Sequence, residues 1–261
     1  MKRLYVIGIG AGDPEYLTVQ AIKVLNRVDV FFVVDKGRAV DDLARLRQAI
    51  CERYIEDPSS YRIVHIPDPV RDREAPSYRT AVESWRDERS RLYEGVIDRE
   101  LGEDETGGFL VWGDPSLYDG TMLVLDGILR RGRVKFDYEV IPGISSVSAL
   151  AARHRVPLNR TGEAIQITTG RRLASAGVPE DVDNVVVMLD SECAFSRIDE
   201  SDLEIYWGAF LGTDDEILVS GCLDERAATV ERVRAAAKEK KGWMFDTYLL
   251  RKAEESGNSR E

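Results

Sequence analysis

The sequence predicts an α/β protein built from two domains, and three observations support this prediction. Apolar runs of five to seven residues alternate with longer helix-compatible stretches between residues 3 and 141. Beyond residue 155 the apolar runs follow one another more closely. Several runs end in Gly-Asp-Pro or Pro-Gly, which are turn-forming sequences. Alternating strands and helices are typical of a sheet that is covered by helices on both faces.

The first domain is expected to span residues 1–156. Its apolar runs have the length and the β-branched and aromatic content of buried strands, and the stretches between them can form helices. The expected strands are 3–9, 28–34, 61–66, 108–112 and 137–141. The expected helices are 14–26, 41–54, 77–101 and 117–131. This order predicts a mostly parallel sheet.

The second domain is expected to span residues 157–250, followed by a polar tail at 251–261. Two apolar runs, 203–210 and 216–221, lie close enough together to form a hairpin, so we expect a mixed sheet. The other expected strands are 164–170, 184–190 and 243–250, with one helix at 224–241.

Composition excludes several classes of protein. A net charge of −11 over 261 residues argues against nucleic acid as a partner, because such proteins usually carry a basic surface. The apolar runs are far shorter than the roughly 18–20 residues that span a bilayer, so we expect a cytoplasmic protein that does not enter a membrane. Three scattered cysteines and two histidines favour neither a disulfide framework nor a zinc site, and no metal is expected.

The first glycine-rich loop lies in "VIGIGAGDPEYLT" (6–18). Gly8, Gly10 and Gly12 follow a strand, where glycine permits a left-handed backbone and close approach of other groups. The spacing approaches the dinucleotide fingerprint G-x-G-x-x-G, but its third glycine is replaced by Asp13. Asp35 ends the next strand, where an acid could bind a ribose. A Rossmann-like nucleotide-binding oxidoreductase therefore remains an alternative.

A second Gly-Asp-Pro occurs in "LVWGDPSLYDG" (110–120), at the carboxyl end of a buried strand, where open α/β sheets bind ligands. Asp114 could cap the next helix or hold a ligand ammonium group. Downstream, "VIPGISSVSAL" (140–150) places Ser145 and Ser146 at a helix start. No nucleophile elbow G-x-S-x-G and no P-loop is present, so serine hydrolase and P-loop chemistry are excluded.

In this order, "GIGAGDPEYLT", "VWGDPSLYDG", "VIPGISSVSAL" and "NVVVMLD" resemble the tetrapyrrole (corrin and porphyrin) methyltransferase family, over roughly 3–250. The resemblance implies a homodimer of subunits with two αβα domains, the class III arrangement. It also implies that S-adenosylmethionine and the tetrapyrrole bind in a cleft between the domains. The longer strings are most similar to the members that act in cobalamin biosynthesis.

Carried onto this chain, the resemblance assigns residues to each ligand. The expected donor-binding residues are Trp112, Gly113, Asp114, Leu117, Ser145, Ser146 and Met188, with the backbone from Ala209 to Gly212. The expected substrate-binding residues are Gly10, Ala11, Gly12, Asp13, Lys36, Arg38 and Arg171. Further cations that could bind substrate carboxylates are Arg71, Arg73 and Arg172. Ala11 departs from the family, in which many members have proline at this position.

The implied reaction transfers a methyl group to C-1 of precorrin-5 and releases the acetyl group as acetic acid, giving precorrin-6A. Methyl transfer from a sulfonium needs mainly in-line positioning, whereas acetyl loss needs a base that activates water. The candidates for this base are Asp35, Asp114 and Tyr118. Another precorrin methyltransferase of the family, or a non-catalytic relative, are the alternatives within this resemblance.

Overall fold

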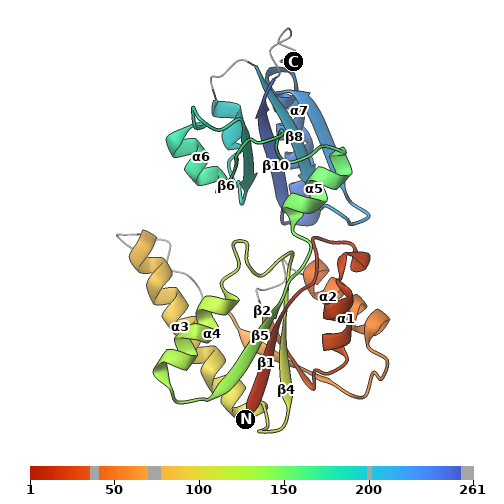
Figure 1. Ribbon diagram of the computed structural model, residues 1–261, viewed down its shortest axis with the longest axis vertical. Coiled ribbons are helices and arrows are strands. Elements are labelled where there is room, and N and C mark those ends of the chain that lie inside the picture. Colours follow the sequence, from red (N-terminus) through yellow and green to blue (C-terminus); the bar gives the residue numbers. More distant parts are fainter. Residues whose placement is uncertain (36–40, 70–77, 199–201, 254–261) are drawn as a thin grey trace. The chain divides into compact units, whose positions relative to one another are not determined.

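The computed structural model describes residues 1–35, 41–69, 78–198 and 202–253. Contacts between Cα atoms divide the chain into two units, Met1–Ser145 and Ser146–Glu261, and each unit holds one five-stranded sheet (Figure 1). The sequence led us to expect this boundary after residue 156. The division lies earlier because α5 (Ser146–His154) packs on strands of the second sheet.

The first sheet has the strand order β3-β2-β4-β1-β5, and every pair of neighbouring strands is parallel. This confirms the mostly parallel sheet predicted for the first domain. All five predicted strands are present, with ends within two residues of the prediction. They are β1 (Lys2–Gly8), β2 (Val30–Asp35), β3 (Arg62–Pro67), β4 (Thr106–Val111) and β5 (Phe136–Ile141).

Helices cover both faces of the first sheet because alternate residues of its buried strands point to opposite sides. In β1, Leu4 and Val6 belong to one buried cluster, which includes residues of α3 (Tyr78–Glu100) and α4 (Thr121–Arg131). Tyr5 and Ile7 belong to the other cluster, with residues of α1 (Val19–Leu25) and α2 (Asp41–Tyr54). Figure 1 shows α3 and α4 on one side of the sheet and α1 and α2 on the other.

Two predicted helices begin later than expected. The stretch 14–26 forms a short 3-10 helix, η1 (Pro14–Tyr16), and then α1, because the Thr18 hydroxyl accepts a hydrogen bond from the N–H of Ala21 at 3.0 Å. Helix α4 begins at Thr121 rather than 117. Gly120 precedes it without a side-chain cap, and the Asp119 carboxylate accepts from the Thr121 N–H at 2.7 Å in the turn before the helix.

The second sheet has the strand order β6-β7-β10-β8-β9 and is mixed, as predicted. Strands β6 and β7 are parallel, whereas β10 runs antiparallel to both β7 and β8. The predicted hairpin is present as the antiparallel pair of β8 and β9. The strands are β6 (Ile165–Thr169), β7 (Asn184–Met188), β8 (Leu203–Ala209), β9 (Ile217–Cys222) and β10 (Asp246–Lys252).

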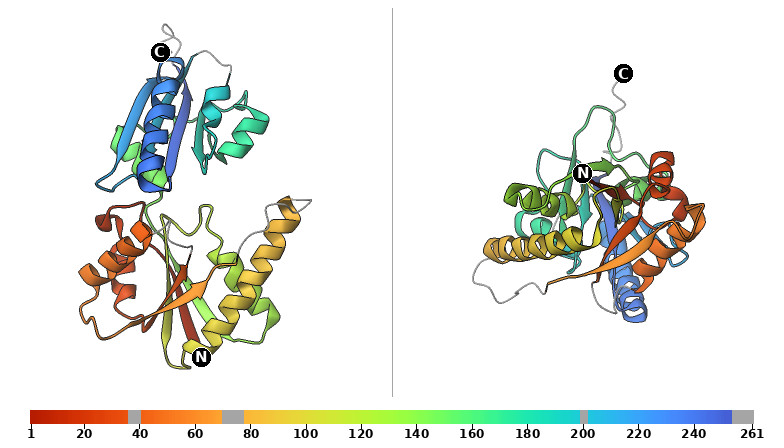
Figure 2. Two further views of the ribbon diagram at one scale, coloured as in Figure 1. Left: turned by 180° about the vertical axis from the view of Figure 1, so that it is seen from behind. Right: turned by 90° about the horizontal axis from the view of Figure 1, so that it is seen from below.

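Two helices and one 3-10 helix cover one face of the second sheet. They are α6 (Gly170–Ala176), η3 (Ala194–Arg197) and α7 (Leu223–Lys241), which contribute to one buried cluster. The rear view in Figure 2 shows α7 against this face. On the opposite face, α5 is attached to β8, where Nε2 of His154 lies 3.0 Å from the carbonyl oxygen of Trp207. None of the helices in the described parts of the chain is both long and apolar enough to cross a membrane.

The expected polar tail starts later than residue 251, because β10 continues to Lys252. Arg251 is only 6% exposed, and its guanidinium donates to the Asn184 side chain at 2.8 Å and to the carbonyl of Pro157 at 2.5 Å. These acceptors compensate for the buried charge and keep the end of the strand attached to the domain.

Candidate functional site

Three loops meet at the carboxyl edge of the first sheet. Because β1, β4 and β5 are adjacent and parallel, the segments that follow them emerge at the same edge. These segments begin with Ile9, Trp112 and Pro142. They hold most of the residues that the sequence assigned to the methyl donor, as well as the first Gly-Asp-Pro loop.

The two Gly-Asp-Pro loops are hydrogen-bonded to each other. The N–H of Gly10 donates to the carbonyl of Gly113 at 3.2 Å, and the N–H of Gly113 donates back to the carbonyl of Gly10 at 2.8 Å. Both glycines have a left-handed backbone, with φ of 81° and 69°. A side chain at either position would be strained, so the reciprocal pair depends on glycine in both loops.

Asp114 joins the second loop to the segment after β5. One carboxylate oxygen accepts from the N–H of Gly143 at 2.8 Å, and the other accepts from both the N–H and the hydroxyl of Ser116. Burial acts to raise the pKa of Asp114, but the hydrogen bonds from Ser116 and from Gly143 lower it below its ordinary value. In contrast, the carboxylate of its counterpart Asp13 accepts from the N–H of Glu15, at 2.8 Å, within its own loop.

The backbones of these loops are packed against each other. A Cβ placed on Gly8 would lie 2.6 Å from the nitrogen of Gly143 and 2.9 Å from Cδ of Pro115. A Cβ placed on Gly143 would lie 2.2 Å from the carbonyl oxygen of Gly113. Since the atoms that would clash are mostly backbone, the loops could not accommodate a side chain without moving apart.

The expected donor-binding residues of the first domain differ in accessibility. Trp112, Asp114 and Leu117 are half-buried, Gly113 is buried, and Ser145 is 8% exposed. In the expected substrate-binding loop, Gly10, Ala11 and Gly12 are buried and Asp13 is half-buried. Of these four residues, Asp13 is therefore the one whose side chain is most accessible to a ligand.

A second group of expected residues lies at one edge of the second sheet. Strands β6, β7 and β8 run in the same direction, because β6 is parallel to β7 and both β7 and β8 are antiparallel to β10. Their carboxyl ends place Arg171, Met188 and Ala209 along this edge. The structure therefore brings together residues that are about 40 positions apart in the sequence.

Thr247, which the sequence analysis missed, connects these residues. It is 3% exposed, and its hydroxyl lies 3.0 Å from the hydroxyl of Ser146. Its backbone is paired with Met188 on one side and with Gly208 on the other. A threonine inside an apolar strand gives no sequence signal for such a position, since threonine is common in strands.

Two residues that follow the strands at this edge have strained backbones. Leu189, after β7, has φ of 53° and is 57% exposed, although leucine is large and apolar. Phe210, after β8, has φ of 50°. Left-handed non-glycine residues are uncommon and are concentrated at functional sites.

The expected backbone contacts from Ala209 to Gly212 are restricted by internal hydrogen bonds. The N–H of Phe210 donates to the carbonyl of Phe245 at 3.0 Å, and the N–H of Gly212 donates to the Glu216 carboxylate at 2.8 Å. A ligand at this segment would therefore meet carbonyl and carbon atoms at these two residues rather than free N–H groups.

A buried ion pair supports the same edge from the α7 side. Nε of Arg234 lies 2.8 Å from the Asp246 carboxylate, which also accepts from the indole N–H of Trp207 at 3.1 Å. The same guanidinium donates to the carbonyl of Asp190 at 2.6 Å, and the Tyr248 hydroxyl donates to the Asp190 carboxylate at 2.7 Å. This network holds the segment after Met188 in place.

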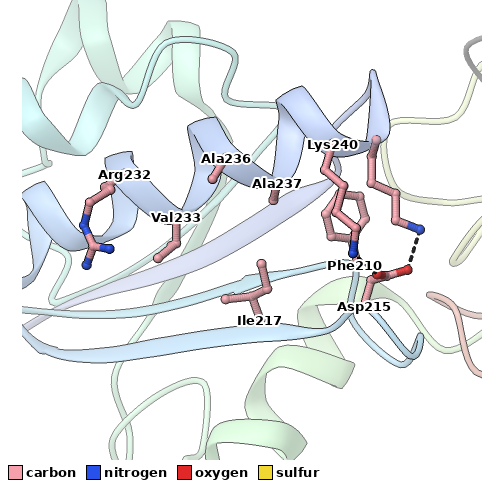
Figure 3. A pocket seen from close by; sticks show the side chains of 9 residues that line it. Phe210, Asp215, Ile217, Arg232, Val233, Ala236, Ala237 and Lys240 are labelled. Carbon is pink, nitrogen blue, oxygen red and sulfur yellow. Dashed lines mark ion pairs between the residues drawn. The ribbon is translucent and has the colours of Figure 1, made fainter.

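A cavity of about 330 Å³ lies beneath α7 in the second domain (Figure 3). Its apolar lining includes Phe210 and Ile217, and an ion pair between Lys241 and Asp215 lies at one end. Phe210 is the one lining residue that belongs to the segment expected to bind the donor. The cavity thus does not coincide with the edge that holds Met188.

Of the expected substrate-binding cations, Arg171 and Arg172 lie in the first turn of α6, directly after β6, and both are exposed. Lys36, Arg38, Arg71 and Arg73 lie outside the described residues.

The three base candidates differ in their surroundings. Partial burial raises the pKa of Tyr118, so its hydroxyl stays protonated at neutral pH. Asp114 has a lowered pKa, and both of its oxygens accept hydrogen bonds within the chain. Both properties disfavour these two residues as bases. Asp35 ends β2 at the carboxyl edge of the first sheet.

The residues present fit a methyl donor that is partly apolar and carries polar ends. In the first domain, the exposed residue Ile144 precedes the buried residue Ser145. In the second domain, the exposed side chain of Leu189 follows half-buried Met188. Apolar surface next to a few placed polar groups is the usual lining of a cofactor site.

Comparison with known proteins gives consistent similarities. The family model for Tetrapyrrole (Corrin/Porphyrin) Methylases matches residues 3–227. The chain is 49% identical to a precorrin-6A synthase [deacetylating] of Sinorhizobium sp, over 97% of this chain and 96% of the relative. It is 26% identical to a probable cobalt-precorrin-2 C(20)-methyltransferase of Methanocaldococcus jannaschii, over 86% of this chain and 90% of the relative.

Solved structures agree with these matches. A cobalamin synthesis related protein (CobF) from Corynebacterium diphtheriae is similar with a TM-score of 0.83 and 37% identity, over 97% of this chain and 100% of that one. A uroporphyrin-III C-methyltransferase from Thermus thermophilus, complexed with S-adenosyl homocysteine, has a TM-score of 0.56 at 18% identity, over 95% of this chain and 96% of that one. The second similarity shows the shared fold alone.

Proposed function

This chain belongs to the tetrapyrrole (corrin/porphyrin) methylase family, and we propose that different loops of the chain bind the methyl donor and the tetrapyrrole substrate. The chain is an S-adenosylmethionine-dependent methyltransferase of cobalamin biosynthesis. Its reaction is the methylation of precorrin-5 at C-1 with loss of the acetyl group as acetic acid, which gives precorrin-6A. Identity of 49% over 97% of the chain supports this specific reaction.

The Rossmann-like oxidoreductase receives no support. The observed strand order, β3-β2-β4-β1-β5, differs from the order 3-2-1 that begins a dinucleotide-binding fold. In addition, the first glycine loop leads into a short 3-10 helix with Pro14 at its start, which removes one of the N–H donors that a pyrophosphate would use.

In the first domain, the donor-binding residues that we propose are Trp112, Gly113, Asp114, Leu117 and Ser145. Asp114 acts by position, since its carboxylate holds Gly143 at a fixed place beside the second loop. In the second domain, the proposed residues are Ser146, Met188 and the segment from Ala209 to Gly212. Bound S-adenosylmethionine supplies an activated methyl group, and these residues fix its orientation and exclude water.

The first Gly-Asp-Pro loop faces the macrocycle in this proposal, with the half-buried side chain of Asp13 as the proposed contact. Arg171 at the start of α6 is a proposed partner for substrate carboxylates, because a guanidinium can bind a carboxylate through two hydrogen bonds. Asp35 is the proposed base for acetyl loss, since the pKa shifts of Asp114 and Tyr118 disfavour both.

The proposed reaction predicts a specific mass change. Incubation of the protein with precorrin-5 and isotopically labelled S-adenosylmethionine is expected to give a product that has gained one labelled methyl group and lost the acetyl group. Mass spectrometry of the macrocycle, with acetate measured in the same mixture, checks both events. A product that gains the methyl group but keeps the acetyl group would assign the chain to another precorrin methylation.

The two aspartates are expected to differ in their effects. Asp114→Ala removes the acceptor for Gly143 and Ser116, so the dissociation constant of S-adenosylmethionine should rise by about tenfold or more, which corresponds to one charged hydrogen bond. Asp13→Ala affects only a turn within the first loop, so it should raise the KM for precorrin-5 instead. Calorimetric titration and steady-state kinetics separate the two effects. Equal losses of donor affinity would contradict the division.

The quaternary structure and location are inferred from the same resemblance. We infer a homodimer, which the exposed Ile165 and Ile167 on the edge strand β6 support, since each of them is more than a third exposed. A cytoplasmic location is consistent with the expected small-molecule substrate.

A further inference from the structure

Arg47 occupies a position on α2 that would ordinarily be apolar. Ile50 and Cys51, three and four residues further along the helix, are buried in the cluster between α2 and the first sheet. Residues at this spacing lie on one face of a helix, so Arg47 lies on the core-facing side. Arg47 lies about one helical turn closer to the start of α2 than Ile50 and Cys51. The start of α2 in turn follows the carboxyl end of β2 in the chain.

Strands β2 and β4 separate just where Arg47 lies. Their pairing ends at Phe32 and Phe109, although β2 continues to Asp35 along β3. The carbonyl of Thr106 accepts from the N–H of Asp29 on the β2 side, and carbonyls alternate in direction along a strand. The carbonyl of Leu110 therefore also faces β2, beyond the last pair that the described residues of the two strands form.

The guanidinium of Arg47 takes the place of the missing strand partner. Its Nε donates to the carbonyl of Leu110 at 3.2 Å. This bond fixes the head group in the gap between the two strands, at the edge of the sheet where open α/β proteins bind ligands. Val33, in the part of β2 that lies beyond the pairing, is only half-buried, which is consistent with an opening here.

The charge of Arg47 is poorly compensated. Burial lowers the pKa of Arg47, against the opposing effects of Asp119 and Tyr93. Among the side chains that the structure describes, which do not include those of residues 35 and 41–44, no carboxylate lies within 4.0 Å of it. In contrast, Arg89 on α3 has its own partners, the Asp68 carboxylate at 2.8 Å and the Tyr93 hydroxyl at 2.9 Å. Arg47 remains protonated, since a guanidinium does not lose its proton in proteins.

We propose that Arg47 binds a carboxylate group of the tetrapyrrole and thereby positions the macrocycle over the gap between β2 and β4. This inference rests on the proposed function, because it takes the acetate and propionate side chains of the substrate as the ligand. With Nε donating to Leu110, the terminal nitrogens of the guanidinium are the donors for the carboxylate.

The test compares three variants on α2. Arg47→Met removes the charge, whereas Arg47→Lys keeps a positive charge but places it on a single nitrogen. Arg45→Met removes an exposed charge from the same helix and serves as the control. Uroporphyrin, a stable tetrapyrrole polycarboxylate, serves as the probe, and its binding is measured by fluorescence titration at several salt concentrations. Melting temperature and the affinity for S-adenosylmethionine are measured for every variant.

Arg47→Met is expected to weaken uroporphyrin binding by about 10- to 100-fold and to reduce its dependence on salt, because one charged contact is lost. Arg47→Lys should recover part of the affinity for uroporphyrin, and Arg45→Met should bind uroporphyrin within about twofold of wild type. The affinity for S-adenosylmethionine should stay within about twofold of wild type in all variants. Tight probe binding by a folded Arg47→Met variant, or no probe binding by wild type, would overturn the proposal. Failure of wild type to turn over precorrin-5 would instead count against the proposed function alone.

Where Arg47→Met does not fold, Arg47→Gln provides the same comparison, since its amide can still donate to the carbonyl of Leu110. A role confined to holding the strands would leave probe affinity unchanged in this variant. Loss of probe affinity with an unchanged melting temperature supports carboxylate binding.

Discussion

Gly143→Ala should abolish tight binding of S-adenosylmethionine, with a dissociation constant at least 100-fold higher than that of wild type, or about 2.7 kcal/mol of binding free energy. The new Cβ would lie 2.2 Å from the carbonyl oxygen of Gly113 and 2.8 Å from Cα of Gly8. No rotamer change can relieve these clashes, because the atoms are backbone. The second loop or the end of β1 must therefore move, and with it the proposed donor-binding residues. Calorimetric titration measures the affinity.

Two further variants show whether the effect comes from this contact. Gly8→Ala places its Cβ 2.6 Å from the nitrogen of Gly143, so it should have the same effect from the opposite side. Gly95→Ala, on α3, meets no atom within 4 Å and should be neutral or slightly stabilising, by about 0.5–1 kcal/mol. A folded Gly143→Ala protein that binds the donor as tightly as wild type would refute the proposed location of the donor site.

Asp246→Ala should destabilise the second domain by about 3–5 kcal/mol, since it leaves a buried guanidinium without its carboxylate. Arg234 and Asp246 are 9% and 4% exposed, and the indole N–H of Trp207 would lose its acceptor as well. For a protein of this size, each kcal/mol lowers the melting temperature by about 2–4 °C. Calorimetry should therefore show an unfolding transition about 10 °C lower than that of wild type.

The double variant Asp246→Leu with Arg234→Met serves as the control. Replacing both charges with apolar groups removes the desolvation cost together with the attraction, so most of the stability should return. Arg234 also donates to the carbonyl of Asp190, and the double variant should consequently bind the donor less tightly even though it is stable. A single Asp246→Ala variant that melts within 2 °C of wild type would show that the pair contributes little.

Much of the first domain could be predicted because its strands are continuous apolar runs with Gly or Pro after them. For β4, the apolar run "GFLVW" predicted the strand, and the Gly113 that follows it predicted where the next loop begins. The short helix α6 was missed, since seven residues beginning with Gly170 carry no helical periodicity. The domain boundary was displaced because α5 packs through tertiary contacts with β8 and β10, which leave no mark on local composition.

The parts of the candidate site whose geometry depends on residue type alone could be predicted from the sequence. The parts whose geometry depends on which strands pair could not. The glycines of the two loops were found from their positions after strands. Their mutual hydrogen bonds were not, because residues 10 and 113 become neighbours only when β1 and β4 pair. Arg47 was missed for a related reason: in a helix with many charges, a single cation on the buried face looks like the exposed ones.

The bridge between Gly10 and Gly113 has a thermodynamic consequence. If one loop contacts the macrocycle and the other contacts the methyl donor, a shift in either loop is transmitted to the other through two backbone hydrogen bonds. Binding of the two ligands is then linked, and linkage is reciprocal. The factor by which the donor changes the affinity for the macrocycle must equal the factor by which the macrocycle changes the affinity for the donor. The same coupling joins the departure of the spent donor to the release of the product.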